Sequence, residues 1–544
     1  MSFTKKEIVI IIGIYILAHA LMLIVTGRWW DDWCSIGIDG ETLFNDFFMP
    51  MGRPDLLWTF YFPRDYYREF TFFAFGVIVF CWNYILRYWL CIDKNHRFWI
   101  CLLLATLPFN DARIVWAVFP YTIGYLLFSL ACVHLTYMLF VRNKVTYGQR
   151  IFDLLLFLCS FTLNSCLVYY AIVLMMLYKY EGEIFNVRRY IKYFDYLLLP
   201  VVFFLVKSMF FTPYGDYQGY NAVTLLSLFK SLLESPLAII FVLTDIFGNY
   251  FKMGQSSWFS LSIILLLLLL IRNRQRIKIY FRGSIEESNT AYEVNESIED
   301  FRKQVLKIGK YGCILLGLAL YSYVVIRHRY RIDTEGLEGR DSVLVGIGAA
   351  MLVYAIVRLC VYKRVAPYVL AFLVICGISY FVRSYEAYQL NYYKQLAFQY
   401  MLDDNKKALA DARNIYVIDK NPDKYGFRSV YVLNSNAEKV FNNQDKLFFT
   451  SQEQILSSWS KEMLVLYHMK DYDILHKKID VICYYSFDMS SKELWKEKLE
   501  EFKNRNNVEH NLRKKAKMMV FSKSDSRYRE ILNDKGFSKD YLAE

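Results

Sequence analysis

The chain has 544 residues, and its composition excludes an ordinary soluble enzyme of that length. Hydrophobic residues make up 56% of the sequence, aromatic residues 18% and charged residues 21%. A composition this apolar excludes intrinsic disorder and is unusual for soluble domains. Several runs, such as residues 8–25, are long enough to cross a bilayer as a helix. The net charge of +12 does not indicate a nucleic-acid partner, because membrane proteins concentrate Lys and Arg on cytoplasmic loops.

The N-terminal segment predicts an uncleaved signal anchor. Lys5 and Lys6 precede an apolar stretch of 18 residues, 8–25, which contains no small-residue cleavage motif. As a helix this stretch extends for about 27 Å, close to the thickness of a hydrocarbon core. We therefore expect the N-terminus to lie in the cytoplasm and the chain to be a multi-pass protein of the cell membrane.

Apolar segments further along the chain predict a polytopic α-helical fold of about eleven membrane-spanning helices. Polar residues at 164–165 interrupt the apolar stretch 151–178, which predicts two short spans that turn there. The stretch 221–250 contains charges and a proline, and we expect it to be re-entrant or interfacial. The predicted spans are 8–26, 70–92, 98–109, 114–141, 151–163, 166–178, 195–211, 258–271, 311–326, 342–361 and 366–382.

Loop charges predict the orientation of these spans. With the N-terminus inside, the predicted cytoplasmic segments carry 22 Lys and Arg residues, and the outer loops carry 11. Cytoplasmic loops of membrane proteins are enriched in these residues. The basic stretch 272–282 is the strongest anchor, because it directly follows a leucine-rich span. An odd number of spans then places the C-terminus outside the cell.

The C-terminal residues 383–544 predict a water-soluble, extracytoplasmic α/β domain that follows a transmembrane domain at 1–382. Apolar runs in this part shorten to strand length and alternate with polar helical patterns. The net charge of residues 383–544 is +4, which again does not indicate nucleic-acid binding. No flexible linker precedes the domain, so we expect it to dock against the transmembrane domain. The predicted strands are 415–418, 430–433, 447–449, 481–485 and 518–521.

The sharpest candidate for a reactive group directly follows the first predicted span. Asp31 and Asp32 lie side by side among three tryptophans, at the outer membrane surface. Interfacial aromatic belts explain the tryptophans but not the paired carboxylates. Adjacent carboxylates repel, and near a low-dielectric boundary the pKa of one of them should rise, which suits a general base or a metal ligand. A solvated turn after the helix is the alternative interpretation.

Arginines concentrate in the predicted outer loop 327–340, against the positive-inside bias. A guanidinium binds phosphate oxygens through two parallel hydrogen bonds, so this loop predicts a site for an anionic phosphate ligand. Contact with anionic lipid headgroups is an equally good explanation. Arg53, in the first outer loop, is a further candidate. The candidate phosphate-binding residues of the loop are Arg327, His328, Arg329, Arg331 and Arg340.

Other outer segments supply further candidates for the same pocket. Asp111 and Arg113 lie together between two short apolar segments. Tyr214, Asp216 and Asp245 belong to the predicted outer element 212–257 and are weaker candidates. The eleven cysteines lie mostly in apolar segments and show no zinc-ligand spacing, so the sequence names no metal site.

This layout resembles the GT-C superfamily of membrane glycosyltransferases. The resemblance covers the overall plan of the chain, and its local motif is the WWDDW sequence at 29–33. It implies a polyprenyl-phosphate-linked sugar as donor and a cell-envelope glycan or lipid as acceptor, on the outer face of the membrane. By analogy, Asp31 or Asp32 would be the general base, and arginines of 327–340, with Arg53, would hold the leaving phosphate. Direct displacement would invert the anomeric centre.

Other interpretations remain open beside this resemblance. Some members of the superfamily use a divalent cation, so Mg²⁺ or Mn²⁺ is a conceivable cofactor. A polymerase or ligase of lipid-linked glycans would rely on arginine and histidine, for which Arg329 and His328 are available. A flippase or transporter of lipid-linked saccharides should show polar residues inside its spans. A binding role for 383–544 is a further alternative. The low proline content and abundant Tyr, Phe and Lys are typical of a bacterial protein.

Overall fold

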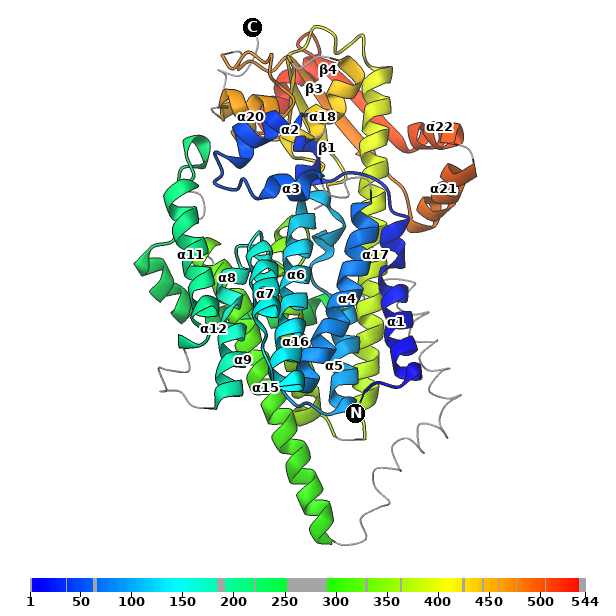
Figure 1. Ribbon diagram of the computed structural model, residues 1–544. Coiled ribbons are helices and arrows are strands. Elements are labelled where there is room, and N and C mark those ends of the chain that lie inside the picture. The colour runs from blue at the N-terminus through cyan, green and yellow to red at the C-terminus, as the bar shows by residue number, and fades with distance from the viewer. Residues whose placement is uncertain are drawn as a thin grey trace.

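The computed structural model consists of a helical bundle with a smaller, sheet-containing domain at one end (Figure 1). The N-terminus lies at the opposite end of the bundle from this domain. The structure describes residues 2–35, 37–61, 66–182, 191–219, 222–251, 291–327, 331–362, 364–422, 426–442, 445–457, 459–475, 477–503 and 505–537.

The helices of the bundle follow the apolar segments of the sequence. The first helix begins with a capping box, in which Thr4 and Glu7 each bond to the backbone N–H of the other. The main helices are α1 (Lys5–His19), α4 (Tyr67–Tyr88), α5 (Lys94–Thr106), α6 (Phe119–Thr136), α7 (Tyr147–Ser160), α8 (Cys166–Tyr169), α9 (Ala171–Glu181), α11 (Phe194–Phe210), α12 (Leu225–Phe251), α15 (Ala291–Arg327), α16 (Val345–Cys360) and α17 (Ala366–Asp404). Short helical turns join or extend them: η1 (Ala20–Leu23), η2 (Trp30–Ser35), α2 (Gly40–Thr42), η3 (Leu43–Phe48), α3 (Leu56–Tyr61), η4 (Asp111–Ile114), η5 (Trp116–Val118), η6 (Tyr137–Arg142), η7 (Gly215–Tyr217) and η9 (Leu337–Ser342).

Six helical stretches of the described chain are long and apolar enough to cross a membrane, which suggests a multi-pass membrane protein. These stretches are Lys5–Leu23, Tyr67–Tyr88, Trp116–Arg142, Leu226–Tyr250, Glu299–Ile326 and Ala366–Asp404. Other predicted spans form shorter helices of 11 to 17 residues, namely α5, α7, α9, α11 and α16. The predicted span 258–271 lies outside the described residues. The count of eleven spans and their orientation stay predictions.

The re-entrant turn expected at 221–250 is wrong, whereas an interfacial position of this segment stays a prediction. α12 is one continuous helix of 27 residues there, with Pro236 inside it. Lys230 and Glu234 lie one turn apart, and their Nζ and Oε1 atoms are 3.6 Å apart, so each charge has a partner on the same helix. A helix satisfies its own backbone groups, so two paired charges and one proline do not force the chain to turn back.

The predicted interruption at 164–165 is confirmed. α7 ends at Ser160, and a turn precedes α8 and α9. This turn packs against α6, where a Cβ added to Gly124 would lie only 2.6 Å from Cβ of Leu163. Glycine at this position is therefore needed for the close approach of the turn.

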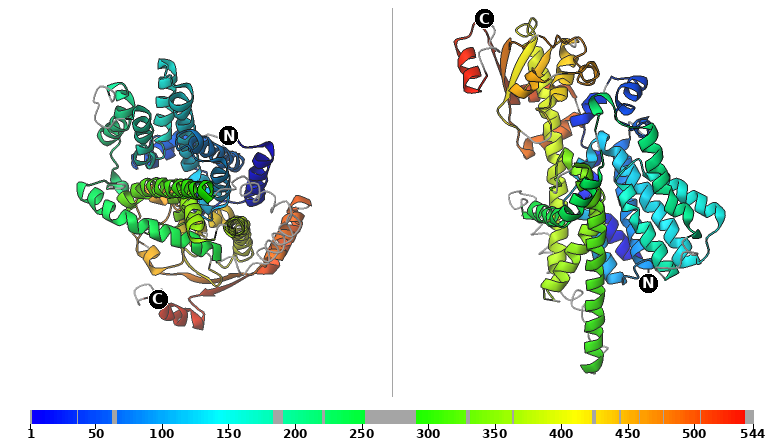
Figure 2. Two further views of the ribbon diagram at one scale, coloured as in Figure 1. Left: turned by 90° about the horizontal axis from the view of Figure 1, so that it is seen from below. Right: turned by 90° about the vertical axis from the view of Figure 1, so that its left-hand side faces the viewer.

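Helix α17 passes straight through the predicted domain boundary at residue 383. It is 39 residues long and runs from the bundle into the sheet-containing domain (Figure 2, right). Leu370, in its first half, belongs to the core of the bundle, and Phe398, in its second half, belongs to the core of the C-terminal domain. Because one helix contributes to both cores, the two parts are joined rigidly and the boundary is not a linker.

The C-terminal domain is built on a four-stranded mixed sheet in the order β2-β1-β3-β4. β1 pairs in parallel with β2 and β3, with Ile415 opposite Phe448 and Val481, and β3 pairs antiparallel with β4. The elements are β1 (Asn414–Asp419), α18 (Val430–Phe441), β2 (Leu447–Phe449), α19 (Gln452–Leu456), α20 (Lys461–Leu466), β3 (Val481–Phe487), α21 (Ser491–Lys503), α22 (Arg505–Lys515), β4 (Ala516–Ser522) and α23 (Ser526–Asp534). The predicted small α/β region is thereby confirmed.

Four of the five predicted strands are present, but the one at 430–433 is wrong. These residues form the first turn of α18, which follows Ser429 as its N-cap. Val430, Val432 and Leu433 are buried there. A run of four apolar residues does not distinguish a strand from the buried first turn of a helix.

The C-terminal domain docks against the bundle, as its lack of a linker predicts. Lys498 Nζ lies 2.9 Å from Thr26 Oγ1, to which it donates, and Gln395 Nε2 donates to the carbonyl of Arg28 at 3.1 Å. Trp30 packs so closely on Gly426 that an added Cβ would lie 2.2 Å from Trp30 Cδ1. All of these bundle residues belong to the segment that leaves the first helix, so the domain covers that segment.

Candidate functional site

The stretch just before the paired aspartates is anchored to two helices, α4 and α17. Arg68, on α4, donates from Nη1 to the carbonyl of Val25 at 3.0 Å and from Nη2 to the carbonyl of Gly27. Its guanidinium carbon lies 5.2 Å from the centre of the Trp29 ring. The indole N–H of Trp29 donates to the carbonyl of Tyr388, on α17. These contacts fix the segment that follows α1 and thereby set the position of η2.

Asp32 is enclosed and cannot face a substrate. Its side chain is fully buried, and its carboxylate oxygens accept the backbone N–H of Ala117 at 2.9 Å and of Trp29 at 3.3 Å. Burial raises the pKa of Asp32 to about 6, although these two N–H groups and the charges of Arg28 and Arg68 lower it. The carboxylate therefore attaches η2 to η5.

Asp31 faces the opposite way and is paired with Arg340. The Asp31 side chain is 42% exposed, and its Oδ2 atom lies 3.0 Å from Nη1 of Arg340, whose side chain is 17% exposed. Arg340 belongs to η9, which closes the arginine-rich loop 327–340. Two candidate clusters that are 309 residues apart in the chain therefore meet at this ion pair.

Three aromatic side chains of the C-terminal domain, Trp459, Tyr431 and Tyr467, form a cluster that we call the aromatic trio. Tyr431 is on α18, which packs against η2, and Tyr467 precedes His468, which contacts Trp33. The ring centroids of Tyr431 and Tyr467 are 5.3 Å apart, and those of Trp459 and Tyr467 are 5.4 Å apart. Burial is the main cause that raises the pKa of both tyrosines, and the Asp31 carboxylate raises it further. The sequence analysis did not include these residues.

His468 joins the C-terminal domain to the backbone of η2. Its Nε2 atom lies 2.8 Å from the carbonyl oxygen of Trp33, and its Nδ1 atom lies 2.6 Å from Oε2 of Glu438. Both ring nitrogens thus face oxygen acceptors, which the N–H groups of the imidazole can bind. Lys439 lies over the Trp33 ring at 4.3 Å from its centre. These contacts fix the segment two residues beyond Asp31.

Replacement of His468 by alanine should loosen this attachment. We expect the His468→Ala variant to lose about 1–3 kcal/mol of stability, because the change leaves a buried carbonyl without its donor. The measurement is thermal unfolding of the purified protein together with limited proteolysis of the C-terminal domain. His510→Ala is the matched control, since His510 is exposed on α22. Equal melting temperatures for the two variants would contradict the attachment.

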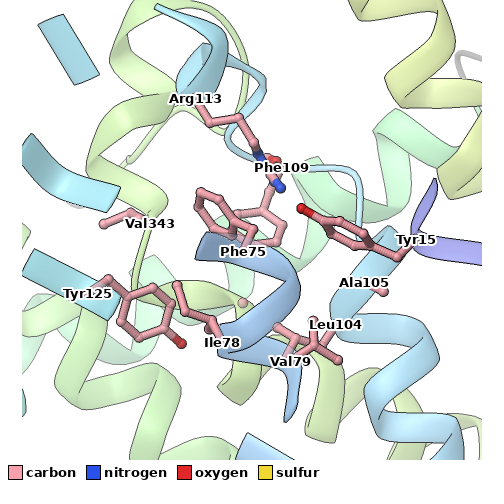
Figure 3. A pocket seen from close by; sticks show the side chains of 11 residues that line it. Tyr15, Phe75, Ile78, Val79, Leu104, Ala105, Phe109, Arg113, Tyr125 and Val343 are labelled. Atoms are coloured by element: carbon pink, nitrogen blue, oxygen red, sulfur yellow. Dashed lines mark hydrogen bonds between the residues drawn. The ribbon is translucent and has the colours of Figure 1, made fainter. Parts of the chain in front are cut away.

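Asp111 and Arg113 are enclosed rather than directed at the Asp31 carboxylate. Asp111 is buried and accepts the N–H of Gly336 at 2.8 Å, which attaches η4 to the loop before η9. Arg113 points into the bundle, where it lies above the rings of Phe75 and Phe109 at the edge of a small cavity (Figure 3). The cavity has room for about one water molecule. Both residues thus hold the framework around the ion pair.

The remaining predicted pocket residues lie in different surroundings. Arg53 pairs with Asp55 through two contacts of 3.2 Å and donates to the carbonyl of Thr162. Asp245 lies half-buried inside α12, not in an outer loop. Exposed positions are occupied by Tyr214, Asp216 and Arg331. The side chain of Arg327, and all of His328 and Arg329, lie outside the described residues.

A divalent cation finds no suitable donor set in the described part of the chain. No group of three or more His, Cys, Asp or Glu side chains comes together there. Near Asp31, one carboxylate of the pair is occupied by backbone N–H groups and the other by Arg340. The residues present therefore do not fit Mg²⁺ or Mn²⁺, which need several oxygen ligands.

A buried polar cluster within the bundle was missed by the sequence analysis. Asp153, on α7, is fully buried, and its two oxygens pair with Nδ1 of His134 at 2.5 Å and with the hydroxyl of Tyr196 at 3.1 Å. The three residues come from α6, α7 and α11. The sequence did show single polar residues within apolar helices, and these could have pointed to a buried polar cluster. Their partners lie on other helices, so their pairing could not be read from the sequence.

Comparison of the chain with protein-family models found no match, and comparisons with curated proteins and with solved structures found none either.

Proposed function

We propose that this protein is an integral membrane glycosyltransferase that moves a sugar from a polyprenyl-phosphate donor to a cell-envelope glycan or lipid. The observation that carries the proposal is the Asp31–Arg340 pair, in which a half-exposed carboxylate and a guanidinium lie 3.0 Å apart next to the first membrane helix. A proton acceptor and an anion-binding group placed side by side are the two functions that such a transfer needs. The plan of the chain, which resembles the GT-C superfamily, agrees with this proposal.

Asp31 is the general base in this proposal, and Asp32 is a positioning residue. The Asp31 carboxylate takes the proton from an acceptor hydroxyl as its oxygen attacks the anomeric carbon of the donor sugar. The bond between that carbon and the phosphate oxygen breaks, and polyprenyl phosphate leaves with the electron pair. Attack from the side opposite the leaving group inverts the anomeric centre. Asp32 is buried and holds η2 in place through Ala117 and Trp29.

Arg340 supports both ends of this reaction. Before transfer, its Nη1 atom orients the Asp31 carboxylate. During transfer, the charge that develops on the phosphate can bind the same guanidinium, which carries more donors than the pair with Asp31 uses. The guanidinium stays charged throughout, because arginine does not lose its proton in proteins. No step of the proposal uses a metal ion.

The test is a transfer assay on membranes that contain the full chain. Labelled polyprenyl-phosphate sugars are supplied singly, and label is counted in the envelope glycan and lipid fractions. We expect transfer from at least one donor, and a 10²- to 10³-fold loss of kcat in Arg340→Ala, as for other groups that bind a developing negative charge. Arg529→Ala is the matched control, because Arg529 is exposed on α23 and belongs to no candidate site. Absence of transfer from every donor, or full activity of Arg340→Ala, would overturn the proposal.

A further inference from the structure

The aromatic trio lies where the C-terminal domain meets the bundle. Trp459 and Tyr467 pack against one core of the C-terminal domain, whereas Tyr431 packs against the core of the bundle. Leu466, next to Tyr467, packs against an outer cluster that contains Leu43 and Phe47. Tyr431 is on α18, and Trp459 and Tyr467 flank α20; both helices belong to the C-terminal domain (Figure 1). The trio is therefore shared by three parts of the chain.

All three rings are half-buried, so each keeps part of its surface accessible. The rings of Tyr431 and Tyr467 are inclined by 38° to each other, and the ring of Trp459 meets Tyr467 edge-on at 80°. Tyr431 is on α18, which packs against η2, the turn that carries Asp31. Aromatic faces, phenolic hydroxyls and the Asp31 carboxylate therefore gather in one small region.

We propose that the aromatic trio binds a saccharide ring next to Asp31, and that this saccharide is the acceptor of the transfer. The second half of this inference rests on the proposed function. One face of a pyranose ring presents C–H groups of slightly positive charge, which match the negative face of an aromatic ring. The hydroxyls at the ring edge need donors and acceptors, which tyrosine hydroxyls and a carboxylate supply.

The position of the trio favours a glycan over a lipid as acceptor. A lipid chain would contact the exposed apolar side chains along the membrane helices, such as Phe210 on α11 and Leu233 on α12. The trio instead stands on the water-soluble domain and mixes apolar faces with polar groups. Ligand sites of this composition, with a few placed polar groups among aromatic side chains, orient a polar ligand by its hydroxyls.

The arrangement also assigns a task to the C-terminal domain. His468 and Lys439 attach this domain to Trp33, which lies two residues beyond Asp31. A saccharide held by the trio is therefore held at a fixed position relative to the base. Fixing two reactants in this way converts an encounter into a step within one complex.

Binding is tested on the purified full chain without any polyprenyl-phosphate donor, so that transfer cannot consume the ligand. The probe is the saccharide fraction released by mild acid from the envelope of the producing cells, and tryptophan fluorescence and calorimetry report binding. We expect saturable binding, and at least tenfold weaker binding in Tyr467→Ala, equivalent to about 1.4 kcal/mol. Phe502→Ala is the control, since Phe502 is an exposed aromatic residue on α21. Tyr467→Phe and Tyr431→Phe separate loss of a hydroxyl from loss of a ring.

Unchanged binding in Tyr467→Ala and Tyr431→Ala, or binding of an envelope peptide fraction in place of the saccharides, would overturn the inference. If Tyr467→Ala fails to fold, the two phenylalanine variants decide, because they retain the rings and should change only the hydroxyl contacts. Failure of the proposed function gives a different result. If the chain binds saccharide through the trio but transfers no sugar, the binding site is supported and the proposed glycosyltransferase activity is overturned.

Discussion

An Asp31→Asn variant should retain its fold and lose transfer. We expect kcat to fall by about 10²- to 10⁴-fold, which is the contribution of a positioned general base. An amide at this position cannot accept the proton of an acceptor hydroxyl. Stability should change by at most about 1 kcal/mol, because the pair with Arg340 involves a side chain that is 42% exposed. The measurement is labelled-sugar transfer by membranes that contain equal amounts of each protein.

The matched control for this variant is Asp534→Asn. Asp534 is an exposed aspartate at the end of α23, in the C-terminal domain, which is predicted to lie on the same side of the membrane. Its substitution should leave transfer within a factor of about two, a change too small to indicate a catalytic role. Full activity of Asp31→Asn, or equal losses in both variants, would show that Asp31 is not the base.

An Asp32→Asn variant should change the pH dependence of stability. In the folded protein the pKa of Asp32 is raised to about 6 by burial, from an ordinary value of 3.8. Between these values the folded state binds more protons than the unfolded state, so stability falls as pH rises through this window. The full penalty above pH 6 corresponds to about 3 kcal/mol. Asparagine does not titrate, so the variant should lack this loss.

Thermal unfolding of the purified protein between pH 4 and pH 8 checks this expectation. The stability of the wild type minus that of Asp32→Asn should decrease as pH rises from 4 to 7 and then level off. At low pH the difference should be small, because the protonated carboxyl and the amide each offer one carbonyl oxygen and one donor group to the N–H groups of Ala117 and Trp29. A difference that stays constant across the range would contradict the raised pKa.

The adjacent pair Asp31 and Asp32 illustrates how far the sequence could go. Its place after the first helix, among tryptophans, singled it out, and the expectation that one carboxylate has a raised pKa agrees with Asp32. Two neighbours on a short 3-10 turn point in different directions, however. Which one is buried depends on Ala117, 85 positions away, whose N–H reaches Asp32. No local pattern contains that information.

The arginine candidates show the same limit. Composition marked the loop 327–340 as unusual, but it could not rank the arginines within it. Arg340 meets Asp31, whereas Arg53 pairs with its near neighbour Asp55, and Arg113 is enclosed by aromatic rings in the bundle. Each of these outcomes depends on how helices pack. The aromatic trio escaped notice because nothing in its local sequence distinguishes Tyr431 or Tyr467 from the other tyrosines of this Tyr-rich chain.

Local elements were predictable where one interaction dominates. Long apolar runs form helices, the polar residues at 164–165 break one, and four short apolar runs form strands. Errors arose where two effects compete. At 430–433 a short apolar run suits either a strand or a buried helical turn, and in the structure it is the first turn of α18, whose apolar residues are buried. In α12 the charges of Lys230 and Glu234 predicted a re-entrant segment, but these two side chains pair with each other on one continuous helix.

The sequence by itself determined that several helices are long and apolar enough to cross a membrane and that a small α/β region follows them, because hydrophobicity and strand or helix periodicity can be read from neighbouring residues. It also marked the aspartate pair and the unusual arginine loop. Only the tertiary structure decided that Asp31 is accessible and Asp32 enclosed, that Arg340 meets Asp31, and that the C-terminal domain packs α18 and its aromatic trio near η2. Those outcomes depend on contacts between residues hundreds of positions apart, and such contacts are set by how the helices and the sheet pack.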